Sequence, residues 1–568
     1  MSAHGRVQTR IFPSAKPREV QKTPLSILDA TVARFSATGA VWMFDELPDA
    51  VAETVFLKTL QSSFVEALNA FPQWAGQLQW AETRLGGGHT ERFNRPVLIW
   101  GAEEDPGVEW NTVQLPLRIH SAVPGPPERA AGTGVWMATD FPQNAMLSTT
   151  PLPLHDLTTY EGLPAMTVQI SLFSGGGYAI GVKISHMLAD AQSLLVFVNL
   201  WATKSQAAMF GTTNIKSHVG VPVFDPSALD ARAAGNIDSP AADPGIVAAA
   251  RALPLHRYDW WDTAAPGYSP YLAPTAEASK PPPSEQLGTA IRPETRAPWY
   301  TWDLSRPVSH ALLHFSRAEL ENLKKAALEE EGTNGSSNHT VPGISRLDAL
   351  LAHIFRTVNR ARFGGDAATR SHGEKGEEEE EEMEVFLDVT LDVRRRVSPP
   401  LPETFIGSPL FLTHVKATTT TTSAEGQSGD GVSKSLGTVA RELRSTMRLF
   451  TPDKVAAMLH DAAFEPSPQR LWQGFVGERH VLVTSWLRLP LYEIDFVGGG
   501  GASAKQRPRY VHPVMPSCDG VVLVVDSALA GYDSGCGGCG GVDVGLFLDR
   551  EVMGRFLGEG EGELRKFR

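Results

Sequence analysis

The sequence predicts an α/β fold, because segments with helical spacing and segments with strand spacing alternate in both halves of the chain. Helices are indicated by apolar residues that recur every three or four positions behind a capping residue. Strands are indicated by β-branched runs or by alternating apolar and polar residues. A long stretch rich in Pro, Ala, Gly and Asp separates the halves. The class is therefore α/β or α+β.

The first half begins its regular structure with a helix before Pro72, on an apolar face of Leu60, Phe64, Leu68 and Phe71. The most informative segment is 178–201. Tyr178, Ile180, Val182 and Ile184 alternate with small or polar residues, which predicts a strand with one buried face.

A helix is predicted directly after this strand. Asp190 stands at an N-cap position, and the spacing then becomes helical at Leu194, Leu195, Val198 and Trp201. The chain is expected to run from strand to short loop to helix, with His186 in the loop.

The second half opens with two predicted helices. Ser316 and Glu319 form a capping box, with Phe315 and Leu320 at the hydrophobic-staple positions. Ser345 begins the next helix, whose apolar face is Leu347, Leu350, Leu351, Ile354 and Val358. Strands are predicted over 385–393, 480–485 and 520–525.

Four stretches are expected to be insertions or linkers: 211–296, 364–384, 418–433 and 535–541. The first is expected to be a crossover that touches both halves, which gives domains 1–210 and 297–568 on either side. The second contains an acidic run, Glu377–Glu382, which cannot bury apolar surface and is expected to be a solvated loop.

Composition places the chain among ordinary globular proteins. Of 568 residues, 42 % are hydrophobic and 20 % charged, and the formal net charge is −13. No basic domain points to nucleic acid. Three cysteines, Cys518, Cys536 and Cys539, cannot make a disulfide framework. With no signal-peptide core or membrane-length apolar run in the sequence, we expect a cytoplasmic monomer that does not contact membranes.

His186 is the first candidate for chemistry. A side chain at a strand end is held by a rigid sheet yet faces a cleft, and imidazole can accept a proton from an alcohol near neutral pH. Asp190, four residues on, could cap the helix or pair with an arginine. Roughly one His-x-x-x-Asp match is expected by chance in a chain of this composition, so the spacing alone also suits a structural histidine and a simple cap.

Five segments in order resemble the motifs of the BAHD acyl-CoA-dependent transferases and their fungal relatives, such as the trichothecene acetyltransferases. In chain order they are FPQWAGQL at 71–78, the HxxxD segment at 186–190, SRLDALLAHIFRTVNRAR at 345–362, DVRRRVSPPLPETFIGS at 392–408 and TSWLRLPLYEIDFVGGG at 484–500. The matches span about 430 residues. The chain is identified as a member of this family.

The resemblance implies two domains like chloramphenicol acetyltransferase with a channel between them. His186 would be the general base, and Asp190 a loop-fixing residue that points away from it. An acyl group would pass directly from acyl-coenzyme A, the co-substrate, to a small-molecule alcohol or amine, as in secondary metabolism. No acyl-enzyme and no bound cofactor are implied.

Further site residues come from the same resemblance. A hydroxyl of Thr484 or Ser485 is the candidate oxyanion donor, and a polar strand end is the alternative. Asp495, Phe496 and Gly498 match an architectural motif, although Val497 and Gly498 replace its Gly and Trp. Arg394 is a candidate for either domain contacts or phosphate binding.

Other chemistries lack their usual motifs. Cys536 and Cys539 have the spacing of half a zinc site, but no second pair exists in the sequence and we expect no metal. The chain has no P-loop and no GxSxG elbow. Two alternatives stay open: a condensation-type enzyme that takes its acyl group from a carrier protein, and an inactive relative that binds a metabolite. The acceptor and the acyl chain length cannot be read from the sequence.

Overall fold

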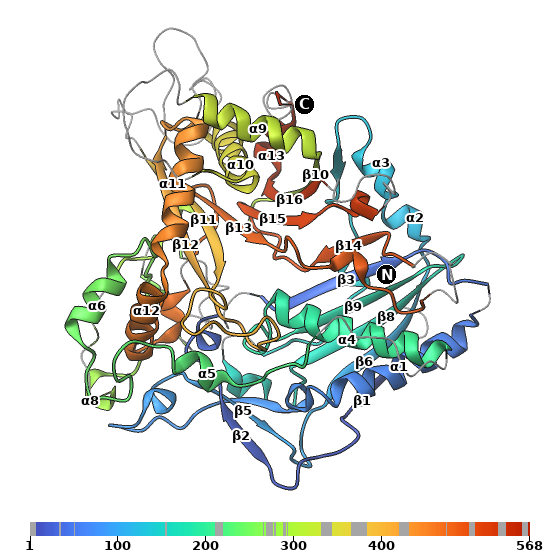
Figure 1. Cartoon of the computed structure of the whole chain (residues 1–568), viewed down its shortest axis with the longest axis horizontal. Helices are drawn as coiled ribbons and strands as arrows, with labels where there is room; N and C mark the ends of the chain where they lie inside the picture. Colours follow the sequence, from blue (N-terminus) through green and yellow to red (C-terminus); the bar gives the residue numbers. More distant parts are fainter. Residues whose placement is uncertain are drawn as a thin grey trace.

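The computed structural model describes residues 7–32, 36–49, 51–153, 156–210, 220–264, 266–268, 277, 280–287, 291, 294–330, 343–364, 383–419, 431–472, 474–498, 506–531, 541–558 and 566–567. Two large mixed sheets lie one above the other in Figure 1, each with its own helices. The predicted α/β class is therefore confirmed. Cys536, Cys539 and the run Glu377–Glu382 lie outside the described residues.

The first sheet has six strands, antiparallel except for one parallel pair, β6 with β8. Their order is β1 (Val7–Ile11), β6 (Val108–Leu115), β8 (Met166–Phe173), β9 (Tyr178–Ile184), β3 (Thr38–Phe44) and β14 (Tyr510–Pro513). The helices α1 (Glu53–Leu68) and α4 (Ala191–Phe210) pack on it through a large hydrophobic core. β9 has the predicted bounds.

The predicted first helix is one turn too long. α1 ends at Leu68, and Phe71 lies beyond it with φ −133° and ψ 48°. The residue before a proline is disfavoured in the α conformation, so Pro72 ends the helical path early. Phe71 is nevertheless buried in the same core as Leu60 and Phe64.

The second sheet has seven strands. Their order is β12 (Leu410–Thr418), β11 (Glu384–Asp392), β13 (His480–Ser485), β15 (Val521–Asp526), β16 (Val542–Asp549), β10 (Val308–Phe315) and β7 (Val135–Met137). Its outer face is covered by α9 (Arg317–Glu329), α10 (Arg346–Phe363), α11 (Leu436–Leu449) and α13 (Arg550–Gly558). The predicted capping box at Ser316 is confirmed, and two predicted strands are shifted by one residue.

Strand alternation gives the second sheet two different faces. On β11, Val385, Leu387 and Val389 pack into the core beneath the helices. Because successive side chains point to opposite faces, Asp388 and Thr390 lie on the other face, toward the first sheet. The same alternation on β13 separates Val481 and Val483 from Leu482 and Thr484.

The two sheets exchange one strand each. β7, from the first half of the sequence, pairs with β10 at the edge of the second sheet. β14, from the second half, pairs with β3 at the edge of the first sheet. The division into domains 1–210 and 297–568 stays a proposal, and these strands would cross it.

The crossover contains α5 (Pro226–Asp230), α6 (Pro244–Arg251) and α8 (Ser284–Leu287). It contacts both halves. The guanidinium of Arg92 donates to Ile237 O at 2.8 Å, and Thr413 donates to Pro254 O at 2.8 Å. α6 packs on α12 (Pro452–Phe464).

The remaining elements are small. A third sheet consists of β2 (Gln21–Pro24), β5 (Pro96–Trp100) and β4 (Gln77–Trp80), and two short helices are α2 (Ile119–Ala122) and α3 (Pro126–Ala130). Among the helices described here, none is both long and apolar enough to cross a bilayer.

Acid should destabilise this fold through its buried histidines. Burial lowers the pKa of His310 and of His414 to about 4, below the usual 6.5. Between those values the unfolded chain binds more protons than the native protein, so the free energy of unfolding should decrease as pH falls from 6.5 to 4. Urea unfolding at pH 7, 5.5 and 4.5 measures this. His310→Phe, which keeps a flat ring against Phe547, should show a shallower pH dependence; an equal slope in both proteins would contradict the assignment.

Candidate active site

His186 lies in the loop between β9 and α4, and Asp190 fixes the end of that loop. Asp190 Oδ1 accepts the backbone N–H of Ser193 at 2.9 Å, which caps α4, and the Asp190 N–H donates to Gly407 O at 3.0 Å. These contacts tie the loop to the segment that follows β11 in the second half.

Asp190 also forms a buried ion pair with Arg394. The guanidinium donates from Nη1 to Oδ2 at 2.6 Å and from Nη2 to Oδ1 at 3.0 Å, and both side chains are at most 3 % exposed. Arg394 donates further to Ser193 Oγ and Phe405 O. Burial disfavours the charged guanidinium, but the charges and hydrogen bonds of Asp190 and Asp392 together outweigh this effect and raise the pKa of Arg394. The structure thus places Asp190 in both contacts that the sequence allowed, and gives Arg394 a contact between the two halves.

The hydrogen bonds of His186 define its tautomer. Ser408 Oγ donates its single hydrogen to His186 O at 2.5 Å, so at its 3.1 Å contact with Nδ1 it must accept. Nδ1 therefore carries the ring proton, and Nε2, for which the described residues provide no donor, carries the lone pair. Asp29 holds Ser408 in place by accepting its backbone N–H at 2.6 Å.

The electrostatic surroundings of His186 keep the ring neutral. Burial lowers its pKa below the usual value of a histidine, and the negative charge of Asp190 offsets only part of this effect. A neutral imidazole with Nε2 unprotonated is the form that can accept a proton.

His186 borders a cavity of about 330 Å³. The first half contributes Thr31, Val32, Ser36, Ala37, Thr38, His186 and Ala191; the second sheet contributes Thr390, Leu410, Leu412, Leu482, Thr484 and Val521 from its inner face. The remaining wall is rich in aromatic rings, with Trp260, Trp302, Phe411, Trp472, Phe475 and Trp486. Residues from both halves thus enclose one space beside the histidine.

Two residues predicted as oxyanion donors are separated by strand alternation. Thr484 lines the cavity, whereas Ser485 is exposed and lies on the other side of β13. Three other threonines of the wall, Thr31, Thr38 and Thr390, donate their hydroxyls to backbone carbonyls. The Thr484 hydroxyl has no such bond among the described residues, so it remains available to a ligand.

The segment with Asp495, Phe496 and Gly498 lies away from the cavity wall. Asp495 Oδ1 accepts the N–H groups of Val497 and Gly498 at 3.0 and 2.7 Å, with Gly498 at φ +73°. The Phe496 ring packs edge-on against Trp201 of α4, with ring centroids 4.7 Å apart. These contacts anchor the turn to the first-half core.

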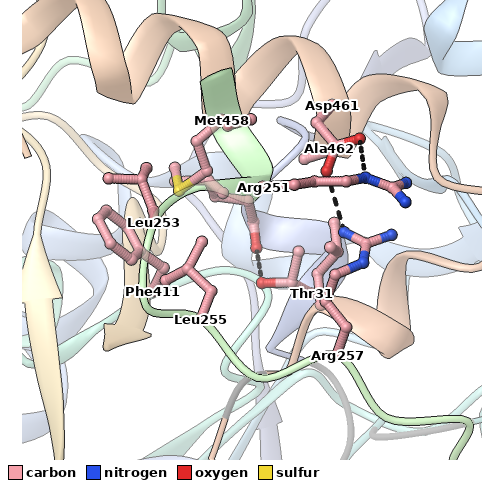
Figure 2. A pocket seen from close by; sticks show the side chains of 12 residues that line it. Thr31, Arg251, Leu253, Leu255, Arg257, Phe411, Met458, Asp461 and Ala462 are labelled. Atoms are coloured by element: carbon pink, nitrogen blue, oxygen red, sulfur yellow. Dashed lines mark hydrogen bonds and ion pairs between the residues drawn. The ribbon is translucent and has the colours of Figure 1, made fainter. Parts of the chain in front are cut away.

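A second, smaller pocket of about 30 Å³ adjoins the cavity and shares Thr31, Phe411 and Leu471 with it. Figure 2 shows that Arg251 and Arg257 both reach Asp461 of α12, at 3.2 and 3.0 Å. This pocket is too small for a substrate. Its ion pairs fix the crossover against α12 behind the cavity wall.

One cluster contains residue types that bind metals. His256 Nε2 and His480 Nδ1 lie 3.0 and 2.7 Å from different oxygens of Asp388. The three ligand atoms lie within 4.8 Å of one another. Both contacts to Asp388 have hydrogen-bond lengths, with the carboxylate as acceptor.

Three features of the site were not singled out from the sequence. Ser408 ends the motif segment 392–408 at the place of the family's Asn, and that substitution was the one available signal. No sequence pattern indicated that Asp29 or the aromatic residues of the wall belong to the site, because these residues are far apart in the chain.

The model of the Transferase family matches residues 140–236 and 305–562 of this chain. Acyltransferase AFT15-1 of Alternaria alternata is 26 % identical over 528 residues, covering 92 % of this chain and 89 % of the relative. Acyltransferase abl6 of Leptosphaeria maculans is 22 % identical over 528 residues, covering 93 % and 90 %. A hydroxycinnamoyl-CoA:5-hydroxyanthranilate N-hydroxycinnamoyltransferase of Avena sativa is 24 % identical over 398 residues, covering 70 % and 68 %.

Solved structures show the same fold. F. graminearum TRI101 in complex with coenzyme A and deoxynivalenol has a TM-score of 0.61 at 15 % identity, over 96 % of this chain and 98 % of that chain. Vinorine synthase has a TM-score of 0.55 at 16 % identity, over 97 % and 96 %. These likenesses confirm the predicted two-domain α/β architecture.

Breaking the buried ion pair between Asp190 and Arg394 should lower the free energy of unfolding. Asp190→Asn removes the buried carboxylate opposite Arg394 and leaves Asp392, 3.3 Å from Nη1 and 47 % exposed, as the remaining acidic partner. We therefore expect a loss of about 3 kcal/mol in the free energy of unfolding. Arg395→Ala is a matched control, because Arg395 is 75 % exposed and paired only with exposed Glu403; it should cost less than about 1 kcal/mol. Urea unfolding of both variants measures these losses. If both variants lose less than about 1 kcal/mol, Asp190 does not have the structural role assigned to it here.

Removing the hydroxyl of Ser408 should release the His186 tautomer. In Ser408→Ala, Nδ1–H loses its Ser408 acceptor and keeps only the contact with the backbone carbonyl of His186 itself, so the population of the Nδ1–H tautomer should decrease. ¹⁵N NMR of histidine-labelled protein measures the populations, with His186→Ala to assign the signal. Ser408→Thr keeps the hydroxyl and should retain the wild-type tautomer. If Ser408→Ala also retains it, some other group holds the ring.

Proposed function

Since this chain belongs to the Transferase family, we propose that it transfers an acyl group from coenzyme A to a hydroxyl or amine of a small molecule, with His186 as general base. Among the described cavity residues, His186 is the one proton acceptor with a free lone pair, at Nε2. That observation carries the proposal. Relatives support the donor: TRI101 binds coenzyme A, and plant relatives are named for hydroxycinnamoyl-CoA.

The proposed reaction is a direct transfer. His186 Nε2 takes the proton of the acceptor as its oxygen or nitrogen attacks the thioester carbon. The tetrahedral intermediate then collapses, the C–S bond breaks, and the thiolate of coenzyme A takes the proton from His186. No group on the enzyme is acylated, so none of the cysteines is needed.

Thr484 supports the intermediate in this proposal. The developing oxyanion needs a donor already aimed at it in a water-poor site. The Thr484 hydroxyl lies on the sheet face that borders the cavity and is not engaged by the described backbone, unlike those of the neighbouring wall threonines. We assign it as the oxyanion donor and leave Ser485 without a role.

His186→Ala should fold normally and reduce turnover about 10²- to 10⁴-fold, the usual range for loss of a general base. Turnover of an acyl-CoA and a reactive alcohol is measured by thiol release. Coenzyme A affinity, from calorimetry, should change little, because the base contacts the reacting atoms only. In the wild type, turnover should decline as pH falls through the His186 pKa, below 6.5, since protonation removes the base. Near-parental turnover in His186→Ala would refute the mechanism.

A further inference from the structure

We propose that the acceptor of this enzyme is an uncharged, lipophilic alcohol, and that charged acceptors, including aliphatic amines, are excluded by the cavity. The proposal rests on the function proposed above. It narrows the choice between oxygen and nitrogen acceptors, which the family motifs leave open.

The first observation is the chemistry of the cavity wall. Among its described residues there is no Asp, Glu, Lys or Arg. The side chains that could donate or accept hydrogen bonds are a few hydroxyls, His186, Cys518 and the indole N–H groups of the tryptophans, and three of the hydroxyls already bond to the backbone. All of these groups are uncharged when His186 is neutral. A charged group that left water for this space would have no opposite charge to meet, which is strongly unfavourable.

The second observation is that the charged side chains near the cavity pair with other residues of the protein. Arg251 and Arg257 line the small pocket next to Phe411, and both pair with Asp461 (Figure 2). Arg257 pairs also with Glu465 and Glu294. Arg394 and Asp190 form a buried ion pair with each other near His186. Among the described residues, these ionic groups near the cavity are thus paired within the protein and do not line the cavity.

The third observation is the aromatic wall. Trp260 stacks on Phe475 with ring centroids 5.6 Å apart, and Trp302 meets the same ring edge-on at 5.6 Å. Rings that brace one another present flat, rigid, apolar surfaces, which favour an extended hydrophobic skeleton over a hydrated one.

An aliphatic amine would meet a further obstacle. It is protonated near neutral pH, with a pKa close to the 10.4 of lysine, and must lose that proton before it can attack. No carboxylate among the described wall residues can take the proton or hold the ammonium, and the single base is needed for the attack itself. A neutral alcohol avoids this step: its O–H proton passes to His186 Nε2 while the C–O bond forms and the C–S bond breaks.

The wild-type enzyme tests the proposal with four acceptors on one naphthalene skeleton. They are 2-(2-naphthyl)ethanol, the corresponding ethylamine, and the alcohol carrying a carboxylate or a trimethylammonium group at the far end. We expect kcat/KM for the neutral alcohol to exceed that of each charged compound by on the order of 100-fold or more. Comparable values for the carboxylate or the ethylamine would overturn the proposal. Efficient use of the trimethylammonium alcohol would show that the rings act as a cation cage, which also overturns it.

Binding separates this proposal from the function it rests on. Calorimetry without any acyl-CoA should show the same preference for the neutral alcohol. If no compound is acylated with any donor, the proposed function fails; if binding then still discriminates against charge, the inference about the cavity stands. Binding without such discrimination overturns it, whatever the activity.

A charge placed in the wall provides a second test. Thr390→Asp adds a carboxylate to the inner face of the second sheet, and Ser445→Asp adds the same charge to the exposed surface of α11. Only Thr390→Asp should change the preference, by at least about tenfold toward the trimethylammonium alcohol. An unchanged ratio in a folded Thr390→Asp protein would contradict the proposal. If that variant does not fold, the wild-type acceptor series and the calorimetry decide.

Discussion

The buried ion pair between Asp190 and Arg394 is the contact on which the site depends. It joins the loop that carries His186, at the end of a first-sheet strand, to the segment that follows β11 of the second sheet. Burying two charges is expensive unless every donor and acceptor is satisfied. Here the carboxylate also caps α4, and the guanidinium also donates to Ser193 Oγ and Phe405 O. The network therefore fixes the two halves at one point, next to the His186 ring.

The same segment that supplies Arg394 supplies the partner of His186. Ser408 lies in the turn before β12 and uses both of its hydrogen-bonding capacities on the loop, one on the His186 carbonyl and one on the ring. Asp29, from the first half, holds the Ser408 backbone. Each half thus positions a group of the other, and the free nitrogen of the imidazole is left to face the cavity.

The crossover presents different side chains on its two sides, with charged residues toward α12 and an apolar ring toward the cavity. Its arginines pair with carboxylates of α12 and the adjoining loop, while Trp260 of the same segment turns an apolar ring to the cavity. The strands exchanged between the sheets, β7 and β14, hold the two halves together at the opposite side of the interface. The charged residues of the crossover are consequently paired outside the cavity, and the described cavity wall contains no Asp, Glu, Lys or Arg.

The sequence by itself determined the fold class, several element boundaries and the family. Capping and alternation are local, so Ser316, Ser345 and the strand at 178–184 could be read from neighbouring residues alone. The ordered motifs identified His186 and Asp190. Only the tertiary structure decided which hydroxyl reaches the cavity, because Thr484 and Ser485 are adjacent hydroxyl residues whose side chains lie on opposite faces of β13. It also decided the partners of Arg394 and Ser408 and the absence of charge from the described wall. Those properties depend on contacts between residues some 200 positions apart, and periodicity carries no information about such distances.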